Sequence, residues 1–473
     1  MPVDYDLVIL GGTLAAREAA AMAARLRAQV ALIEPSVNPP LGLTADLVCC
    51  GLQQVLQSSG PGPMDVAEAV AWLQALDGAV AAERSPAHLT ALGVDVIQSS
   101  AEFVRRPMFG LRVGPRLLRS RRFLLATGTY TVMPPIPGLV ALSPMQRLTP
   151  EALAQPQLWT KLASRMPQQI ALLGDGAIAL AWAQIWARLG ATVTLICPDG
   201  VLPHADREVA ARLVMHLEAD GIQVLAHRTV MQVQSEGDRL QLKTNHRAND
   251  EILDADALLV TLQQPQVEGL NLEGIRLQST PQLPQNSRQQ TANSRIYALS
   301  GNPQMARYEA QVAVQAALAV PWQPRWRRRA AEGLWISQVV PTDPPLAQVG
   351  LTEEAARQRW GDRTIVMRQS LNAIPKAHLR QRNGGICKLI LRPNGQLVGA
   401  HILAAEAEEW IGIVALAMQQ RLSLTYLASG AIAPLAMAEV LHQAAIDWHQ
   451  HHQQPLLLAL YDCWFDGLRT RSR

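Results

Sequence analysis

The stretch DLVILGGTLAAREAAAMAARLRAQVALIE, from Asp6 to Glu34, decides the fold of this chain of 473 residues. A short apolar run is followed at once by Gly11-Gly12, as in a buried parallel strand that leads into a tight turn. The alanine-rich segment Leu14–Arg27 then predicts a helix, and QVALIE predicts a second strand. The stretch therefore predicts a βαβ unit with a glycine turn, closed by an acid 23 positions after Gly11.

The same order of elements returns later in the chain. The segment QQIALLGDGAIALAWAQIWARLGATVTLIC, Gln168–Cys197, again predicts a strand, a glycine turn, a long helix and a strand. Two such units indicate two Rossmann-type domains, each of which normally holds a nucleotide. Beyond Trp335 the pattern changes to alternating strands and helices, and Asn394-Gly395 predicts a β-hairpin within Ile386–Leu403. We therefore predict an α/β protein in which two Rossmann-type nucleotide-binding domains precede a C-terminal α+β domain.

The domain boundaries follow from the order of these units. A linker, RFLLATGTYTVMPPIPG, ends a predicted strand in a glycine turn and a proline-rich segment between the two βαβ units. We predict a discontinuous first nucleotide-binding domain, a second one inserted into it, an α+β domain and a C-terminal tail. Their predicted residues are 1–150 with 265–332, 151–264, 333–450 and 451–473, respectively.

Composition excludes several classes of protein. Lys and Arg total 42 and Asp and Glu total 39, so the net charge of +3 lacks the basic excess of a nucleic-acid-binding surface. The five cysteines are an odd number without metal-type spacing. The C-terminal histidines His442, His449, His451 and His452 have no obvious acidic or cysteine partner, so we expect no metal site. Because the sequence shows neither a leader pattern nor a long apolar run, we expect a cytoplasmic protein.

Five motifs, in order, carry a family resemblance. They are the first βαβ unit with Glu34, LLATGTYTVMPPIPGL, the second βαβ unit, SRIYALSG (Ser294–Gly301) and PPLAQVGLTEEAARQRW (Pro344–Trp360). Together they make the chain resemble the pyridine nucleotide-disulfide oxidoreductases, with dihydrolipoamide dehydrogenase and mercuric reductase as the closest types. The resemblance implies FAD in the first domain, an NAD(P)-type second domain, and a homodimer formed through the C-terminal domain.

The resemblance also assigns an FAD site to particular residues. Glu34 corresponds to the acid that holds the ribose hydroxyls of the adenosine, and Thr13 replaces a glycine while offering a hydroxyl that can bond phosphate. Gly301 stands where the family has an aspartate that bonds the flavin side chain, and Asn302 is a candidate to replace it. The residues predicted to contact FAD are Gly11, Gly12, Thr13, Ala16, Glu34, Gly42, Thr44, Ala126, Thr127, Gly128, Gly301 and Asn302.

The redox-active dithiol of the family is altered in this chain. In the segment LGLTADLVCCG, the resemblance places Ala45 at the first family cysteine and Cys50 at the second, the one nearest the flavin. Cys49 takes the place of a glycine between them. The two adjacent cysteines are interpreted as small packing residues, as a lone reactive thiolate at Cys50, or as a strained vicinal disulfide.

Two further features of the family also differ in this sequence. The positions of a lysine and a glutamate that pair beside the flavin are taken by Gln54 and Ala181. The position of the histidine in the family's acid–base dyad falls on Pro434 or Ala433, neither of which can move a proton. The glutamate of the dyad remains as Glu439, which we expect to be a solvated or hydrogen-bonded helix residue.

The second nucleotide turn keeps its first two glycines, Gly174 and Gly176, as candidate contacts for a second nucleotide. Cys197 replaces the acid that would select NADH, and no arginine follows it to favour NADPH. The sequence leaves open whether this domain binds NADH, NADPH, another nucleotide or none.

These departures predict an FAD-dependent flavoprotein oxidoreductase that performs no dithiol exchange. Its flavin would pass electrons directly between a donor and an acceptor, each a small molecule or a protein, unlike the mechanism of dihydrolipoamide dehydrogenase or mercuric reductase. The alternative is a catalytically inactive family member that serves as a nucleotide-binding or protein-interaction scaffold. The tail resembles a short interfacial helix or a strap over the partner subunit, so a peripheral membrane contact stays open.

Overall fold

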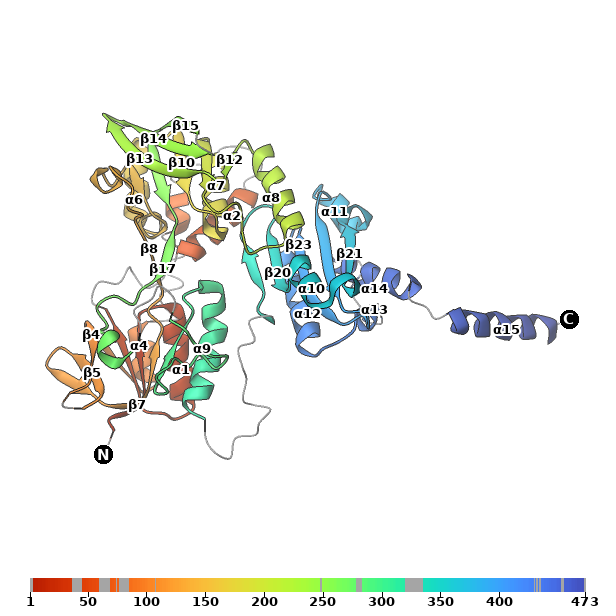
Figure 1. Ribbon diagram of the computed structural model, residues 1–473, viewed down its shortest axis with the longest axis horizontal. Coiled ribbons are helices and arrows are strands. Elements are labelled where there is room, and N and C mark those ends of the chain that lie inside the picture. Colours follow the sequence, from red (N-terminus) through yellow and green to blue (C-terminus); the bar gives the residue numbers. More distant parts are fainter. Residues whose placement is uncertain are drawn as a thin grey trace. The chain divides into compact units, whose positions relative to one another are not determined.

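The computed structural model describes most of the chain in two compact units (Figure 1). The described residues are 3–35, 45–58, 69–73, 75, 85–106, 108–246, 249–277, 283–319, 335–428, 430, 433, 435–451 and 455–471. Unit 1 comprises Met1–Pro203, Val214–Gly333 and Val340–Thr342, and unit 2 comprises His204–Leu213, Leu334–Val339 and Asp343–Arg473.

A parallel sheet in unit 1 contains the first βαβ unit. Its strand order is β18-β7-β1-β2-β3, with β1 (Tyr5–Leu10) in the middle. The other strands are β2 (Val30–Glu34), β3 (Val94–Gln98), β7 (Ser120–Leu125) and β18 (Ile296–Ala298). Leu7 and Ile9 point into a cluster with the alanines of α1 (Leu14–Arg25) and α9 (Pro303–Ala317). Val8 and Leu10 point into a second cluster on the opposite face, because side chains alternate along a strand.

Short antiparallel strands and helices complete this part of unit 1. The second cluster is covered by β4 (Ala101–Val104), β5 (Gly110–Val113) and β6 (Arg116–Leu118). The remaining elements are α2 (Ala45–Ser58), α4 (Pro86–Ala91), β8 (Thr129–Thr131), η1 (Leu139–Ala141), β17 (Gln263–Pro265) and η2 (Glu273–Ile275). Strands β8 and β17 pair antiparallel. The linker that follows β7 therefore lies beside residues 263–265, in the segment through which the chain returns to this sheet.

The second βαβ unit forms another parallel sheet, in the order β12-β11-β10-β16-β9. Its strands are β9 (Arg147–Leu148), β10 (Gln169–Leu173), β11 (Thr192–Cys197), β12 (Gln223–Ala226) and β16 (Ala257–Val260). Around it lie α5 (Pro150–Leu153), α6 (Pro156–Ser164), α7 (Ala177–Arg188) and a three-stranded sheet of β13 (Thr229–Glu236), β14 (Arg239–His246) and β15 (Asn249–Ala255). Helix α8 (Arg207–Ala219), between β11 and β12 in the chain, is divided between the two units. Both predicted βαβ units are confirmed, with the predicted ends of the first within two residues of the observed ones.

Unit 2 is built on a five-stranded sheet in the order β19-β20-β23-β22-β21, with helices around it. Its elements are β19 (Gln338–Val340), β20 (Leu346–Gly350), α10 (Glu353–Trp360), η5 (Gly361–Arg363), β21 (Ile365–Ser370), η6 (Leu371–Ala373), α11 (Pro375–Leu379), β22 (Ile386–Leu391), β23 (Leu397–Leu403), α12 (Ala407–Gln419), α13 (Thr425–Ala428), α14 (Glu439–His451) and α15 (Pro455–Arg471). Strands β22 and β23 pair antiparallel across the turn at Asn394-Gly395, which confirms the predicted hairpin.

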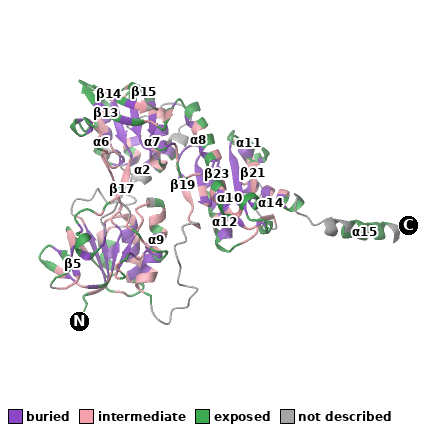
Figure 2. Cartoon of the chain, in the orientation of Figure 1, coloured by how far each residue is buried: buried purple, intermediate pink, exposed green. Residues whose placement is uncertain are grey.

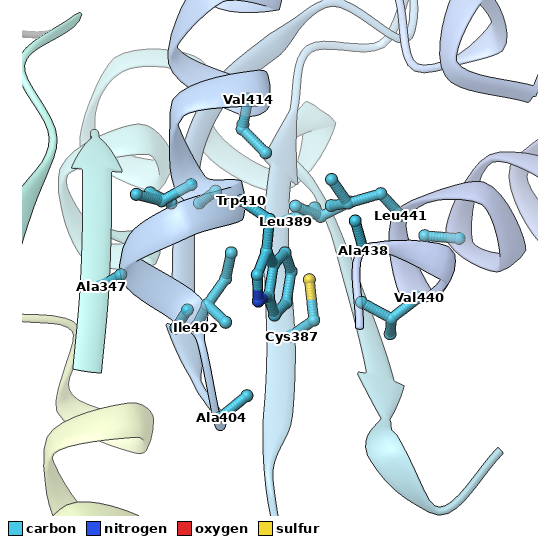
Figure 3. Packing of buried hydrophobic residues seen from close by; sticks show 14 of the residues in the cluster. Ala347, Cys387, Leu389, Ile402, Ala404, Trp410, Val414, Ala438, Val440 and Leu441 are labelled. Carbon is cyan, nitrogen blue, oxygen red and sulfur yellow. The ribbon is translucent and has the colours of Figure 1, made fainter. Parts of the chain in front are cut away.

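The core of unit 2 lies between this sheet and α12 and α14. Cys387, Leu389 and Ile402 from the strands share one buried cluster with Trp410 of α12 and Leu441 of α14 (Figure 3). The burial pattern in Figure 2 shows the same arrangement, with buried strands and partly exposed helices. Among the described residues, none of the helices combines the length and the apolar character that crossing a membrane requires.

Candidate functional site

The turn after β1 meets the turn after β7 so closely that only glycine fits at position 11. Gly11 has φ of 128°, and a Cβ atom added to it would lie 2.1 Å from the carbonyl oxygen of Ala126. The Ala126 N–H donates to the Leu10 carbonyl at 2.8 Å, which fixes the second turn against the end of β1. Gly128, with φ of 81°, ends this turn and accepts a hydrogen bond from the Gln266 N–H at 2.8 Å. The predicted contacts Gly11, Ala126 and Gly128 therefore lie together.

Thr13 is the N-cap of α1. Its hydroxyl accepts from the Ala16 N–H at 3.1 Å and donates to the Ala126 carbonyl at 2.9 Å. A Cβ atom at Gly128 would lie 2.7 Å from the γ-methyl of Thr13, so this side chain fills the space between the two turns. The hydroxyl that the sequence offers to a phosphate therefore already makes two hydrogen bonds, and N-capping is the role that a threonine just before a helix commonly takes.

Glu34 ends β2 and is paired with Arg17, a residue that the sequence analysis did not single out. The Arg17 Nε donates to the Glu34 Oε1 at 2.7 Å, and the two side chains are 6% and 3% exposed. Glu34 thus lies at the carboxyl end of a central parallel strand, where Rossmann-type folds bind the ribose of a dinucleotide. Its carboxylate is held by a cation from the first turn of α1.

The segment after β18 carries a buried carboxylate that the sequence analysis also missed. Gly301 has φ of 85°, and Asn302 caps α9 by accepting from the Gln304 N–H at 3.0 Å. Glu309 of α9 is 2% exposed and accepts from the Ser300 N–H at 2.8 Å. Burial raises the pKa of Glu309, although the hydrogen bonds from Ser300 oppose the shift. A carboxylate is therefore present beside Gly301, but it comes from a helix nine residues after Ser300.

The cysteine pair lies in α2, with its two members in different environments. Cys49 is fully buried and Cys50 is exposed, and neither forms a disulfide. The packing interpretation therefore holds for Cys49 but not for Cys50, and the vicinal disulfide is absent. Successive residues of a helix point about 100° apart, which accounts for the difference. The predicted FAD contacts Gly42 and Thr44 lie outside the described residues.

Hydrogen bonds of the Gln53 side chain join α2 to α7. The Gln53 amide donates to the Ala181 carbonyl at 3.2 Å and to the Gln184 side chain at 3.1 Å. Arg188 donates to the Gln53 oxygen at 3.3 Å. The residue that faces Ala181 is thus Gln53, one position before the Gln54 that the resemblance gives, and Gln54 is exposed. At the positions where the resemblance places an ion pair, the described residues of these two helices form hydrogen bonds instead.

The second glycine turn is tight at Gly174 and open at Gly176. Gly174, with φ of 154°, lies against Thr261, whose hydroxyl would be 2.0 Å from an added Cβ atom. Gly176 is the N-cap of α7, and a Cβ atom there would meet none of the described residues within 4 Å. Cys197 is buried and donates to the Gly174 carbonyl at 3.3 Å. Burial, with the nearby charge of Asp175, raises the pKa of Cys197 to about 12, so the thiol stays neutral and cannot replace a carboxylate at a ribose.

The segment that the resemblance assigns to the acid–base dyad differs from expectation at Glu439. Pro434 lies outside the described residues, and Ala433 is exposed. Glu439 begins α14, and its Oε2 is buried without a hydrogen-bond partner among the described residues. At this oxygen, therefore, Glu439 is neither solvated nor hydrogen-bonded within the described chain. His442 contacts the Ala428 carbonyl at 2.9 Å, and the described residues contain no cluster of potential metal ligands.

These residues fit the adenosine half of a flavin adenine dinucleotide better than the flavin half. A side-chain-free turn at Gly11, the N-terminus of α1 and the acid Glu34 are the parts that hold a pyrophosphate and a ribose. On the flavin side Gly301 offers no side chain, and Glu309 is the nearby carboxylate. FAD is therefore compatible with the described residues, with its strongest contacts expected at the adenosine.

Comparison with known proteins agrees with this geometry. A mercuric reductase of Staphylococcus aureus is 28% identical over 474 residues, which covers 94% of this chain and 82% of that protein. The structure of the HOCl-induced flavoprotein disulfide reductase RclA from Escherichia coli shares the fold, with a TM-score of 0.78 at 24% identity over 93% of this chain and 99% of that one. LpdA from Mycobacterium tuberculosis also shares it, with a TM-score of 0.78 at 20% identity over 94% of this chain and 99% of that one.

Two family regions account for most of the chain. The pyridine nucleotide-disulphide oxidoreductase family matches residues 5–317, and the dimerisation domain of the same family matches residues 336–445. The second match supports a homodimer. The chain belongs to the pyridine nucleotide-disulphide oxidoreductase family, whose members are FAD-dependent oxidoreductases.

Proposed function

We propose that this chain is an FAD-dependent oxidoreductase that passes electrons directly through its flavin, without dithiol exchange. The observation that carries the proposal is the cysteine pair in α2. A dithiol needs two thiols that can reach one another, whereas here one thiol is fully buried and its neighbour is exposed. The position of the first family cysteine is Ala45, so the residue that would exchange with Cys50 is missing.

The protein residues then have binding and positioning roles. When bound, FAD supplies the reversible uptake of electrons, so the loss of thiols and acids from the protein does not forbid redox turnover. Gly11 and the first turn of α1 receive the pyrophosphate, and Glu34 holds the adenosine ribose. The hydrogen bonds of Gln53 with Gln184 and Arg188 keep α2 against α7. The open turn at Gly176 leaves room for a second nucleotide as the electron donor.

The first test is the visible absorption spectrum of the freshly purified protein, followed by anaerobic titration with NADH and with NADPH. We expect flavin absorbance that bleaches on titration and returns when ferricyanide is added. We also expect turnover with ferricyanide to change less than about twofold in Cys50→Ser, because the proposed electron path uses no thiol. Reduction of oxidised lipoamide by NADH should be absent from both proteins.

The outcomes separate the candidate functions. Lipoamide turnover that Cys50→Ser abolishes would restore dithiol chemistry and contradict the proposal. Flavin absorbance that persists after titration with NADH and with NADPH would show that another molecule is the electron donor. A protein that is colourless and takes up no added FAD would rule out the flavoenzyme. The second candidate function, an inactive nucleotide-binding or protein-interaction scaffold, would then remain. That candidate is favoured by Thr13 and Asn302, whose side chains cap helices, and by Gly301.

We also propose that the C-terminal helix α15 makes a peripheral contact with a membrane. Its exposed apolar residues recur every three to four positions and so lie on one helix face. They are Leu460 (65% exposed), Tyr461 (57%), Trp464 (66%), Phe465 (50%) and Leu468 (46%). Aromatic and leucine side chains on one face, followed by the arginines at 469, 471 and 473, suit the boundary between lipid headgroups and acyl chains.

The prediction for α15 is that the double variant Leu460→Ser/Trp464→Ser binds lipid vesicles at least about tenfold more weakly than the wild type. Each side chain would contribute roughly 1.5–3 kcal/mol when buried. Co-sedimentation with phosphatidylcholine–phosphatidylserine vesicles measures the effect. Ile252→Ser is the matched control, since Ile252 is also 65% exposed but lies on β15. A wild-type protein that stays in the supernatant would rule out the membrane contact.

A further inference from the structure

The ion pair between Arg17 and Glu34 has features that a surface salt bridge lacks. Both side chains are almost fully buried, at 6% and 3% exposure, and the Nε–Oε1 distance is 2.7 Å. Charged side chains are rarely buried unless they are paired, because each loses its hydration. The two residues also come from different elements, α1 and the end of β2. The pair thus fixes a carboxylate at the edge of the sheet where the ribose of a dinucleotide is expected.

The hydrogen bond from Arg17 uses only part of the accepting capacity of the Glu34 carboxylate. An ionised carboxylate has about four positions at which it can accept hydrogen bonds. The Arg17 Nε occupies one of them, on Oε1. The remaining positions can accept from the 2′- and 3′-hydroxyls of a ribose, which are the groups that an acid at this place binds in Rossmann-type sites. A charge-assisted hydrogen bond is shorter and stronger than a neutral one, so it fixes the orientation of its acceptor.

We propose that Arg17 is a positioning residue that keeps the Glu34 carboxylate aimed at the adenosine ribose of FAD. This inference rests on the proposed use of FAD, and it adds a preference for ligands that carry the adenosine ribose. The Arg17–Glu34 pair acts only on ligands that carry the adenosine ribose. It therefore contributes to the binding of FAD and ADP and contributes nothing to the binding of FMN, which lacks that ribose.

The variant Arg17→Met tests the inference, because methionine keeps an apolar stem of similar length and removes the cation. Dissociation constants for FAD, ADP and FMN would be measured by isothermal titration of the full-length, flavin-depleted protein. We expect FAD and ADP to bind about tenfold more weakly or worse, by the same factor, with FMN affinity unchanged. In a Glu34→Gln background the Arg17→Met change should have no further effect on FAD or ADP, because the two residues act as one unit.

Two controls keep the result interpretable. Arg25→Met removes an exposed arginine from the same helix and should leave all three affinities unchanged. Arg17→Lys retains the charge without the Nε donor, so it should recover part of the ADP affinity even if the methionine variant fails to fold. Equal loss of FAD and FMN binding in Arg17→Met, or no loss of either, would overturn the positioning role while leaving the proposed function in place. A wild-type protein that binds neither flavin would overturn both.

Discussion

Replacing Lys388 by methionine is expected to lower the free energy of unfolding by about 3–5 kcal/mol, the usual cost of removing one partner from a buried ion pair. The Lys388 side chain is 2% exposed, and its ammonium contacts three carboxylates. The distances are 2.7 Å to Asp206, 3.1 Å to Glu208 and 2.8 Å to Glu353. Asp206 is equally buried, so methionine would leave a carboxylate without its cation in the interior of unit 2.

The pH dependence of this loss follows from the pKa shifts of the cluster. Burial alone would raise the pKa of Asp206, Glu208 and Glu353, but hydrogen bonds from Lys388 and its neighbours outweigh burial and hold all three below their usual values. Carboxylates with lowered folded-state pKa values stabilise the fold above their unfolded values of 3.8 and 4.5, and lose this contribution as the pH falls further. The difference between wild type and Lys388→Met should therefore be largest near neutral pH and shrink below about pH 4.

Denaturant unfolding followed by circular dichroism, repeated across this pH range, measures the effect. The matched control is Lys243→Met, because Lys243 pairs with Asp250 at 2.6 Å but the two side chains are 48% and 49% exposed. Exposed pairs contribute about 0–1 kcal/mol, so this control should change little at any pH. Equal effects of the two substitutions at neutral pH would show that the buried cluster contributes no more than a surface ion pair.

The fold was largely predictable because its signals are local. The βαβ units are encoded by apolar runs, glycine turns and alanine-rich helices, each contained within about 30 residues of sequence. The observed bounds of β1, α1 and β2 differ from the predicted ones by two residues or less. The hairpin of β22 and β23 likewise follows from its Asn-Gly turn. For the C-terminal tail the sequence predicts either a short interfacial helix or a strap over the partner subunit, and α15 shows that the segment is helical.

The candidate site and the buried ion pairs were less predictable than the fold, because their contacts depend on how distant segments of the chain are brought together. Lys388 and Asp206 are 182 residues apart in sequence, and no periodicity indicates that they meet. In the sequence, Arg17 is one of several polar positions on an alanine-rich helix. Only the structure shows that Glu34, at the end of β2, lies beside it. Thr13 is the exception, since a threonine just before a helix is a local N-cap signal that was available but was interpreted only as a phosphate ligand.

Replacing Gly11 by alanine is expected to destabilise unit 1 by more than about 4 kcal/mol, at the far end of the range for single substitutions. The added Cβ would lie 2.1 Å from the Ala126 oxygen and 2.6 Å from its carbonyl carbon. Both are backbone atoms in a turn that is hydrogen-bonded to Leu10, so no change of rotamer can relieve the overlap. The positive φ of Gly11 adds strain for any residue with a side chain. Soluble yield, circular dichroism and denaturant unfolding measure the loss.

Gly190→Ala separates the two sources of this strain. Gly190 also has a positive φ, of 93°, but an added Cβ would meet nothing within 4 Å. This control should therefore cost only the conformational strain, about 1–2 kcal/mol. Both variants are measured without added FAD, because the overlap at Gly11 exists whether or not a nucleotide is bound. If Gly11→Ala were as stable as Gly190→Ala, the two turns would have room to move apart, and glycine at this position would be required for ligand approach rather than for the fold.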